Sequence, residues 1–140
     1  MAKWRRTTRI HTFLYRATRG LIGHRVGPIR MLLLTTTGRK SGVPRTLPLA
    51  YVPEGDEFIV LASNGGQEQP PLWWLNLEAR PEAEVQVGSE RFRARAHRAV
   101  DGERAQLWPM LAKANPMWSA YEKRTRREIP VVVLHRLDSR

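Results

Sequence analysis

The sequence contains no cysteine, which excludes disulfides, thiolate zinc sites, iron–sulfur clusters and cysteine nucleophiles. The histidines form no pair at i, i+4 spacing, so no metal site is predicted; they are His11, His24, His97 and His135. The motifs G-x-S-x-G, G-x-x-x-x-G-K-S/T and G-x-G-x-x-G are also absent. These absences disfavour a hydrolase with a nucleophile elbow, a P-loop NTPase and a Rossmann domain.

Long apolar runs are missing too. None approaches the ~20 residues that a membrane-spanning helix needs, and the basic start at residues 1–6 is not followed by the apolar segment of a secretory signal. We therefore expect a cytoplasmic protein. A length of 140 residues and a hydrophobic content of 41% suit one packed domain, so residues 1–140 are expected to form a single domain.

Acidic residues are absent from the first 53 positions, which hold eleven of the 24 Lys and Arg residues. The net charge of +11 arises there, because the later positions carry equal numbers of basic and acidic residues. Such asymmetry indicates an anionic partner for this part of the chain: nucleic acid, an anionic membrane or a polyanionic small ligand. A solvated basic surface is the alternative.

Residues 4–22 show the pattern of a basic amphipathic helix. Their apolar residues recur at i, i+3, i+4 and i+7, at Ile10, Phe13, Leu14, Ala17 and Leu21. A helix of this kind can lie on an anionic membrane, here at the inner face of the cell membrane, or cover one side of a domain core. The pattern does not decide between the two.

β-Branched and alternating segments predict six strands, at residues 31–37, 45–52, 58–62, 83–87, 91–100 and 129–137. A short helix is expected over 72–77, a second from an Asp101 N-cap to about residue 114 with Pro109 kinking or dividing it, and a third over 116–121. Most strand connections are short, so the sheet should be largely antiparallel. The fold class is therefore α+β, mainly β: a small six-stranded barrel with helices around it.

Two groups of residues could bind a ligand. The turn at residues 38–42 combines glycines with Arg39 and Lys40, and Arg45 follows; these can donate to phosphate or carboxylate oxygens. A hairpin turn with its charges in water is the alternative. The second group is aromatic and suits either a planar heterocycle or a core: Trp73, Trp74, Trp108, Trp118 and Tyr121.

The run at residues 32–42, with Pro44, Arg45, Pro48 and Leu49, closely resembles the deazaflavin-dependent nitroreductase family. The same resemblance is carried by residues 62–66, by Pro71, Trp73, Asn76 and Leu77, and by residues 129–133. It covers roughly residues 28–137 and implies a split β-barrel of the flavin-reductase type, preceded by the basic helix within residues 1–25. It also implies a bound coenzyme F-420, a deazaflavin with a phosphate and a polyglutamate tail; FMN is the less favoured cofactor.

The resemblance also implies roles for individual residues. Those that would hold phosphate and carboxylates are Arg39, Lys40, Ser41 and Arg45. Those that would surround the ring are Pro48, Leu61, Ala62, Ser63, Asn64, Leu72, Trp73 and Asn76. On the substrate side, where the family commonly has several tyrosines, this chain has Asn115, Trp118 and Tyr121.

The implied reaction is hydride transfer from the reduced deazaflavin to a planar acceptor such as a quinone, a nitroaromatic or an activated alkene. Ser63 and Tyr121 are the candidates for hydrogen bonding to the acceptor oxygen, where negative charge develops. A non-catalytic protein of the same fold that binds deazaflavin, FMN or haem is the alternative. A third alternative is a protein that binds nucleic acid or a membrane surface. Nucleic-acid binding ranks last, because no RNP-like or helix-turn-helix pattern is present.

Overall fold

The computed structural model describes residues 10, 12–13, 15–16, 25–26 and 29–137. Its strands are β1 (Arg25–Val26), β2 (Ile29–Thr37), β3 (Pro44–Glu54), β4 (Glu57–Leu61), β5 (Glu82–Val87), β6 (Glu90–Ala99) and β7 (Val131–Arg136). Its labelled helices are the 3-10 turn η1 (Asn64–Gly66), α2 (Leu72–Ala79), α3 (Asp101–Ala114) and α4 (Pro116–Arg124).

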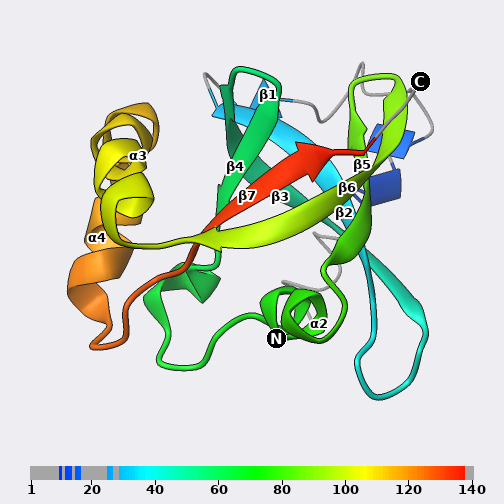
Figure 1. The fold of residues 1–140 in the computed structure, drawn as a ribbon, viewed down its shortest axis with the longest axis horizontal. Coiled ribbons are helices and arrows are strands. Elements are labelled where there is room, and N and C mark those ends of the chain that lie inside the picture. The colour runs from blue at the N-terminus through cyan, green and yellow to red at the C-terminus, as the bar shows by residue number, and fades with distance from the viewer. Residues whose placement is uncertain (1–9, 11, 14, 17–24, 27–28, 138–140) are drawn as a thin grey trace.

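The strands form one closed antiparallel barrel (Figure 1). Their order is β1-β2-β3-β4-β7-β6-β5, and a further pairing of β2 with β5 closes the barrel. The six expected strands are confirmed, with ends that differ from the expected ones by at most two residues. The two-residue β1, which pairs with the start of β2, was not predicted.

The barrel interior is filled by alternate residues of the strands. β6 shows the period most clearly, with Phe92, Ala94 and Ala96 buried between exposed arginines. The end of the barrel is covered by α2 (Figure 1), whose Trp73, Trp74 and Leu77 belong to the same buried cluster. Those indoles therefore pack as core.

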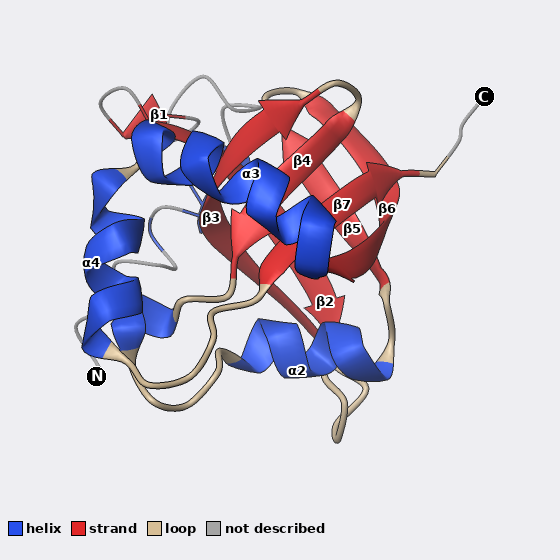
Figure 2. Cartoon of the chain, turned by 60° about the vertical axis from the view of Figure 1, so that its left-hand side comes forward, coloured by secondary structure: helices blue, strands red, loops and turns tan. Residues whose placement is uncertain are grey.

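A second apolar cluster covers the outer side of the barrel. α3 lies across the sheet, with α4 beside it (Figure 2). Side chains of α3 and α4 pack on the outward residues of β3, β4 and β7, including Ile59, Leu61, Val131 and Val133. Because both faces of β7 are covered, its first four residues are all buried.

One detail of the helices differs from the expectation. The residue before α3 is Val100, and Asp101 is the first helical residue with φ of 52°, so the expected Asp101 N-cap is wrong. An acid in the first turn still suits the helix dipole. Pro109 lies inside α3 without dividing it.

The N-terminal region is described at five positions, all helical; the rest of the helix expected over 4–22 lies outside the described residues. Tyr15 is fully buried, whereas Ile10 and Phe13 are 53% and 69% exposed. The Tyr15 phenol accepts a hydrogen bond from the Gly88 amide at 2.8 Å and lies 3.0 Å from the Met31 carbonyl oxygen. This polar residue docks the helix where β2 and β5 close the barrel. No helix in the described part of the chain is long and apolar enough to cross a membrane.

Candidate functional site

The turn between β2 and β3 displays its cations to solvent. The Gly38 amide donates to the Val43 carbonyl at 2.9 Å, and the Ser41 hydroxyl accepts from the Val43 amide at 3.1 Å. A Cβ at Gly38 would lie 2.5 Å from Ser41 Oγ, so a side chain there would displace the Ser41 hydroxyl. Ser41 thus shapes the turn from within.

The side chains of Arg39, Lys40 and Arg45 are exposed. No ion pair joins any of the three to an acid in the described part of the chain. Their donors can therefore meet an anion without first losing a carboxylate partner.

Asn76 fastens this turn to α2. Its side-chain oxygen accepts from the Arg39 amide at 3.0 Å, and its side-chain nitrogen donates to the Thr36 hydroxyl at 3.0 Å. The residue is 7% exposed. Because both of its polar groups bond within the protein, Asn76 acts on a ligand through the position of Arg39.

The residues predicted to contact the ring or the substrate fall on two sides of the barrel wall. Leu61, Trp118 and Tyr121 belong to the outer cluster. By strand alternation Pro48 faces the same side as Ala50, which packs on that cluster. Ala62 and Trp73 instead lie in the barrel interior. Leu72, at the start of α2, is 72% exposed.

β3 and β4 separate beside Pro48. They pair only from Val52↔Ile59 to Glu54↔Glu57. Extending this register would set Ser63 opposite Pro48, but no pairing joins them among the described residues. The strand edge at residues 44–51 is thus available there, and a proline is tolerated because edge positions do not need its missing N–H.

Ser63 lies in the loop that follows β4, just before η1. Ser63 is 9% exposed, and its hydroxyl has no hydrogen-bond partner among the described residues. Asn64 has φ of 47° and its side-chain nitrogen donates to the Gln69 carbonyl at 2.9 Å. Gly66, with φ of 80°, is close to α4: a Cβ there would lie 3.0 Å from the Tyr121 carbonyl oxygen. The Ser63 hydroxyl is thus not used by a hydrogen bond within the described part of the protein.

Sequence reasoning missed Arg127. Its Nη2 donates to the Ala62 and Ser63 carbonyls at 3.1 and 2.9 Å, and its Nε donates to the Gln67 carbonyl at 3.0 Å. Burial lowers the pKa of the Arg127 guanidinium, and the nearby Glu68 carboxylate opposes that shift. The partners are some sixty residues away in the chain, so no local pattern could have identified it.

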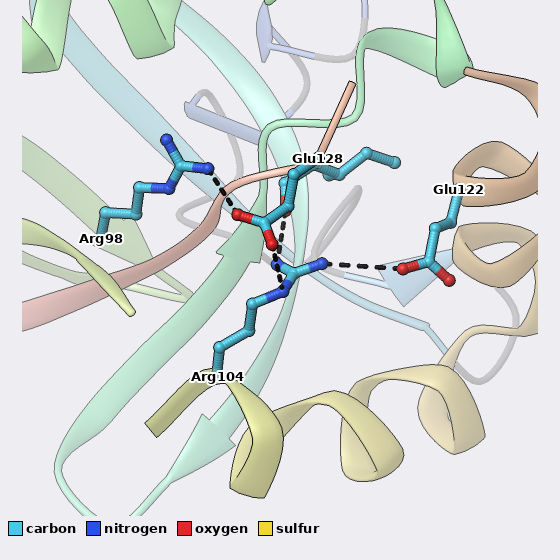
Figure 3. Close-up of polar contacts among 5 residues, drawn as sticks. Arg98, Arg104, Glu122 and Glu128 are labelled. Atoms are coloured by element: carbon cyan, nitrogen blue, oxygen red, sulfur yellow. Dashed lines mark hydrogen bonds and ion pairs between the residues drawn. The ribbon is translucent and has the colours of Figure 1, made fainter. Parts of the chain in front are cut away.

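An ion-pair network holds the segment that contains Arg127. Glu128 pairs with Arg98 at 2.9 Å and with Arg104 at 3.5 Å, and Arg104 also pairs with Glu122 of α4 at 3.6 Å (Figure 3). Arg104 donates to the Ile129 carbonyl at 2.6 Å. α3, α4 and the connection to β7 are therefore joined beside the loop after β4.

Arg16 is a second residue without a predicted role. Its Nη2 donates to the Thr46 hydroxyl at 3.0 Å and lies 3.5 Å from the Thr35 hydroxyl. Thr35 and Thr46 are cross-strand partners on the outer face, in step with Pro48. A cation from the N-terminal helix thus lies between Pro48 and the turn.

The three predicted substrate-side residues differ in how their side chains are used within the protein. The Asn115 side chain caps α4 by accepting from the Met117 amide at 3.1 Å. Trp118 is buried in the outer cluster, and Tyr121 is partly buried with the Arg124 guanidinium 5.8 Å from its ring. Of the three, only Asn115 uses its side-chain polar group to build a helix end.

Known proteins resemble this chain in both sequence and structure. The profile of a family described as F420H(2)-dependent quinone reductase matches residues 7–136. An F420H(2)-dependent quinone reductase of Mycobacterium tuberculosis (strain ATCC 25618 / H37Rv) is 43% identical over 132 residues, covering 91% of this chain and 89% of the relative.

Solved structures agree with the sequence comparison. A structure described as an F420-H2 dependent reductase (FDR-A) is 35% identical with a TM-score of 0.69, covering 75% of this chain and 93% of its own. Another, described as a domain-swapped dimer, is 32% identical with a TM-score of 0.73, covering 96% of this chain and 98% of its own.

Proposed function

The chain belongs to the F420H(2)-dependent quinone reductase family, and from this we propose that it transfers a hydride from reduced coenzyme F-420 to a quinone. The observation that supports the placement of the coenzyme is the exposure of Arg39 and Lys40 on the turn between β2 and β3, and of Arg45 at the start of β3, with no acidic partner in the described part of the chain. Nitroaromatics are the second class of planar acceptor that the same chemistry could reduce.

The residues present suit the coenzyme. Its phosphate and polyglutamate tail are anionic, and guanidinium and ammonium groups donate charge-assisted hydrogen bonds to such oxygens. Ser41 and Asn76 support these cations by shaping the turn and fixing the Arg39 backbone. Arg16 adds a cation on the way from the turn to Pro48.

We place the ring where β3 and β4 separate. Pro48 would face it from one side, and Leu61 with the Ser63 loop from the other. Small-molecule sites are mostly apolar with a few placed polar groups, and here the polar group is the Ser63 hydroxyl. The predicted contacts of Ala62, Asn64 and Trp73 would be made through the backbone or by supporting this wall, because their side chains are buried or bonded within the protein.

The bound, reduced deazaflavin supplies the hydride. Ser63 would donate a hydrogen bond to the acceptor oxygen, where charge develops, and so stabilise the transition state. Tyr121 would donate a second hydrogen bond to the acceptor oxygen or donate a proton to it. Solvent can also supply that proton. Trp118 would form the apolar wall that keeps water from the acceptor.

Fluorescence titration with oxidised F-420 and FMN, followed by oxidation of reduced F-420 by menadione, tests this function. We expect binding of F-420 in preference to FMN, and oxidation that depends on both protein and menadione. Tight binding of F-420 without menadione-dependent oxidation would favour the non-catalytic alternative. Preference for FMN would contradict the assignment of the coenzyme.

We also propose that the N-terminal helix contacts the anionic surface of a membrane, where quinones reside. Its support is that Phe13 and Ile10 are exposed on the helix that Tyr15 docks, in an acid-free and basic part of the chain. Phe13→Ser should reduce co-sedimentation with vesicles of anionic lipid, and Met117→Ser, at another exposed apolar residue, should not. Equal co-sedimentation of all three proteins would contradict this contact.

A further inference from the structure

We propose that Arg127 is a positioning residue that sets the direction of the Ser63 hydroxyl by holding the backbone of the loop after β4. This inference rests on the proposed function, because Ser63 has a role only if the ring and acceptor lie beside it. Arg127 itself bonds to carbonyl groups of the loop, and we assign it no contact with the coenzyme.

The geometry is that of a single side chain spanning the loop. Arg127 reaches the carbonyl before the loop at Ala62, the Ser63 carbonyl at its start and the Gln67 carbonyl at its end. A planar guanidinium can do this because its donors point in fixed, divergent directions. One side chain thus fixes both ends of the turn.

The loop needs such support. Asn64 and Gly66 have positive φ values of 47° and 80°, a conformation that costs free energy for the non-glycine residue. Its backbone amides make two bonds within the turn, from Gly66 to the Ser63 carbonyl at 2.8 Å and from Gln67 to the Asn64 carbonyl at 3.2 Å, and the Asn64 side chain adds a bond to the Gln69 carbonyl at 2.9 Å. Strained backbone of this kind persists only when neighbouring groups hold it.

Ser63 depends on its backbone for direction, since its hydroxyl has no partner among the described residues. The Ala62 amide just before it donates to the Pro130 carbonyl at 3.0 Å, and its own carbonyl accepts from Arg127. The segment between α4 and β7 therefore holds Ser63 from both sides. A shift of about 1 Å at a reacting group can cost about a hundredfold in rate, so this support bears on catalysis.

The same segment supplies a matched control. Glu128, next to Arg127, has different partners: it pairs with Arg98 and Arg104 (Figure 3). Glu128→Gln weakens the attachment of the segment to α3 and β6 without removing a bond to the loop. A general loosening of the segment would affect both variants alike, whereas positioning of Ser63 would affect Arg127 variants alone.

A double-mutant cycle between Arg127→Gln and Ser63→Ala tests the proposal in the full-length protein. We expect Arg127→Gln to lower kcat with menadione about tenfold or more, with Kd for oxidised F-420 within about threefold of wild type because the turn cations still hold the tail. In the Ser63→Ala background the same change should lower kcat by no more than about twofold. Arg127→Lys, which keeps one donor group, should recover part of kcat, and Glu128→Gln should retain the wild-type value.

Independent effects of Arg127→Gln and Ser63→Ala on kcat, multiplying in the double variant, would overturn the proposal. So would an equal loss of kcat in Glu128→Gln. Hydrogen exchange of the amides at residues 63–67, measured without ligand, adds a readout that needs no turnover. Arg127→Gln should speed this exchange more than Glu128→Gln does. If wild-type protein fails to oxidise reduced F-420, the proposed function fails; unchanged exchange in Arg127→Gln means that the positioning itself fails.

Discussion

The β2–β3 turn and the loop after β4 both carry predicted binding residues, but the protein prepares them in opposite ways. The turn displays Arg39, Lys40 and Arg45 to solvent with no described acidic partner. The loop is instead held by Arg127, and the Ser63 hydroxyl has no hydrogen-bond partner among the described residues. Charge is useful to an anionic ligand wherever it is exposed, whereas a single hydroxyl is useful only if its direction is fixed. The first region should therefore govern affinity and the second the rate of reaction.

The largest expected effect comes from removing the charge of the turn. Changing Arg39, Lys40 and Arg45 together to Ala should weaken F-420 binding about a hundredfold or more, because several charge-assisted hydrogen bonds are lost. Fluorescence titration at low and high salt measures the loss, and the salt dependence of binding should flatten in the variant. A triple variant at Arg91, Lys113 and Lys123, exposed on other elements, is the control for net charge. Equal affinity for F-420 in the turn variant and in wild type would contradict the conclusion that the turn governs affinity.

Asn76→Ala should affect both stability and affinity. It removes two hydrogen bonds and leaves the Arg39 amide and the Thr36 hydroxyl without their partner, which should cost about 2–4 kcal/mol of unfolding free energy. Urea unfolding measures this, and F-420 titration of the folded variant should show a weaker complex because Arg39 is no longer fixed. Asn76→Asp, which keeps the acceptor for the Arg39 amide, should retain more affinity. A variant that is destabilised but binds F-420 normally would show that the attachment of the turn to α2 does not determine affinity.

Tyr15→Phe should lower stability by about 1–2 kcal/mol, because the Gly88 amide loses its acceptor. Burial raises the pKa of the Tyr15 phenol above its ordinary value of 10.0, an effect opposed by the hydrogen bond from Gly88 and supported by Tyr51. The neutral phenol is thus favoured by folding. Its contribution should be full below about pH 10 and decline as the pH rises further, since the unfolded chain then loses the proton first. Thermal unfolding of both proteins between pH 8 and about pH 11 should show a smaller alkaline loss in Tyr15→Phe.

The smallest expected effect is that of Arg16→Gln. Removing this exposed cation from the outer face should weaken F-420 binding about threefold, and less at high salt, since a single exposed charge is well screened. Titration at two salt concentrations checks this. An effect as large as that of the turn variant would show that the N-terminal helix, and not the turn, supplies the main anion site.

The local pattern predicted most of the fold. Alternation in residues such as Phe92 and Ala94, the glycine turn at residues 38–42 and the proline that begins α4 each depend on neighbours in the chain. Period and turn chemistry therefore sufficed to place the strands and to propose a barrel. They did not reveal how the N-terminal helix docks, because Tyr15 is buried by contacts with Met31 and Gly88, far from it in sequence.

The candidate site likewise contains some features that the sequence predicted and others that only the structure shows. The cluster of cations could be predicted because the absence of acids from the first third is visible in the sequence. The resemblance pointed to Asn76, Asn115 and Ser63 alike, yet the first two use their side chains to join elements and to cap a helix. Whether a side-chain amide or hydroxyl is hydrogen-bonded within the protein depends on partners that the sequence does not show.

Composition and periodicity by themselves determined an antiparallel barrel with a basic turn at one end and no acidic residue before Glu54. Only the tertiary structure decided that β3 and β4 separate beside Pro48 and that Arg127 holds the Ser63 loop across a separation of 64 residues. The reason is range: strand period, turn residues and charge act between near neighbours, whereas hydrogen-bond partners are selected when distant segments pack together.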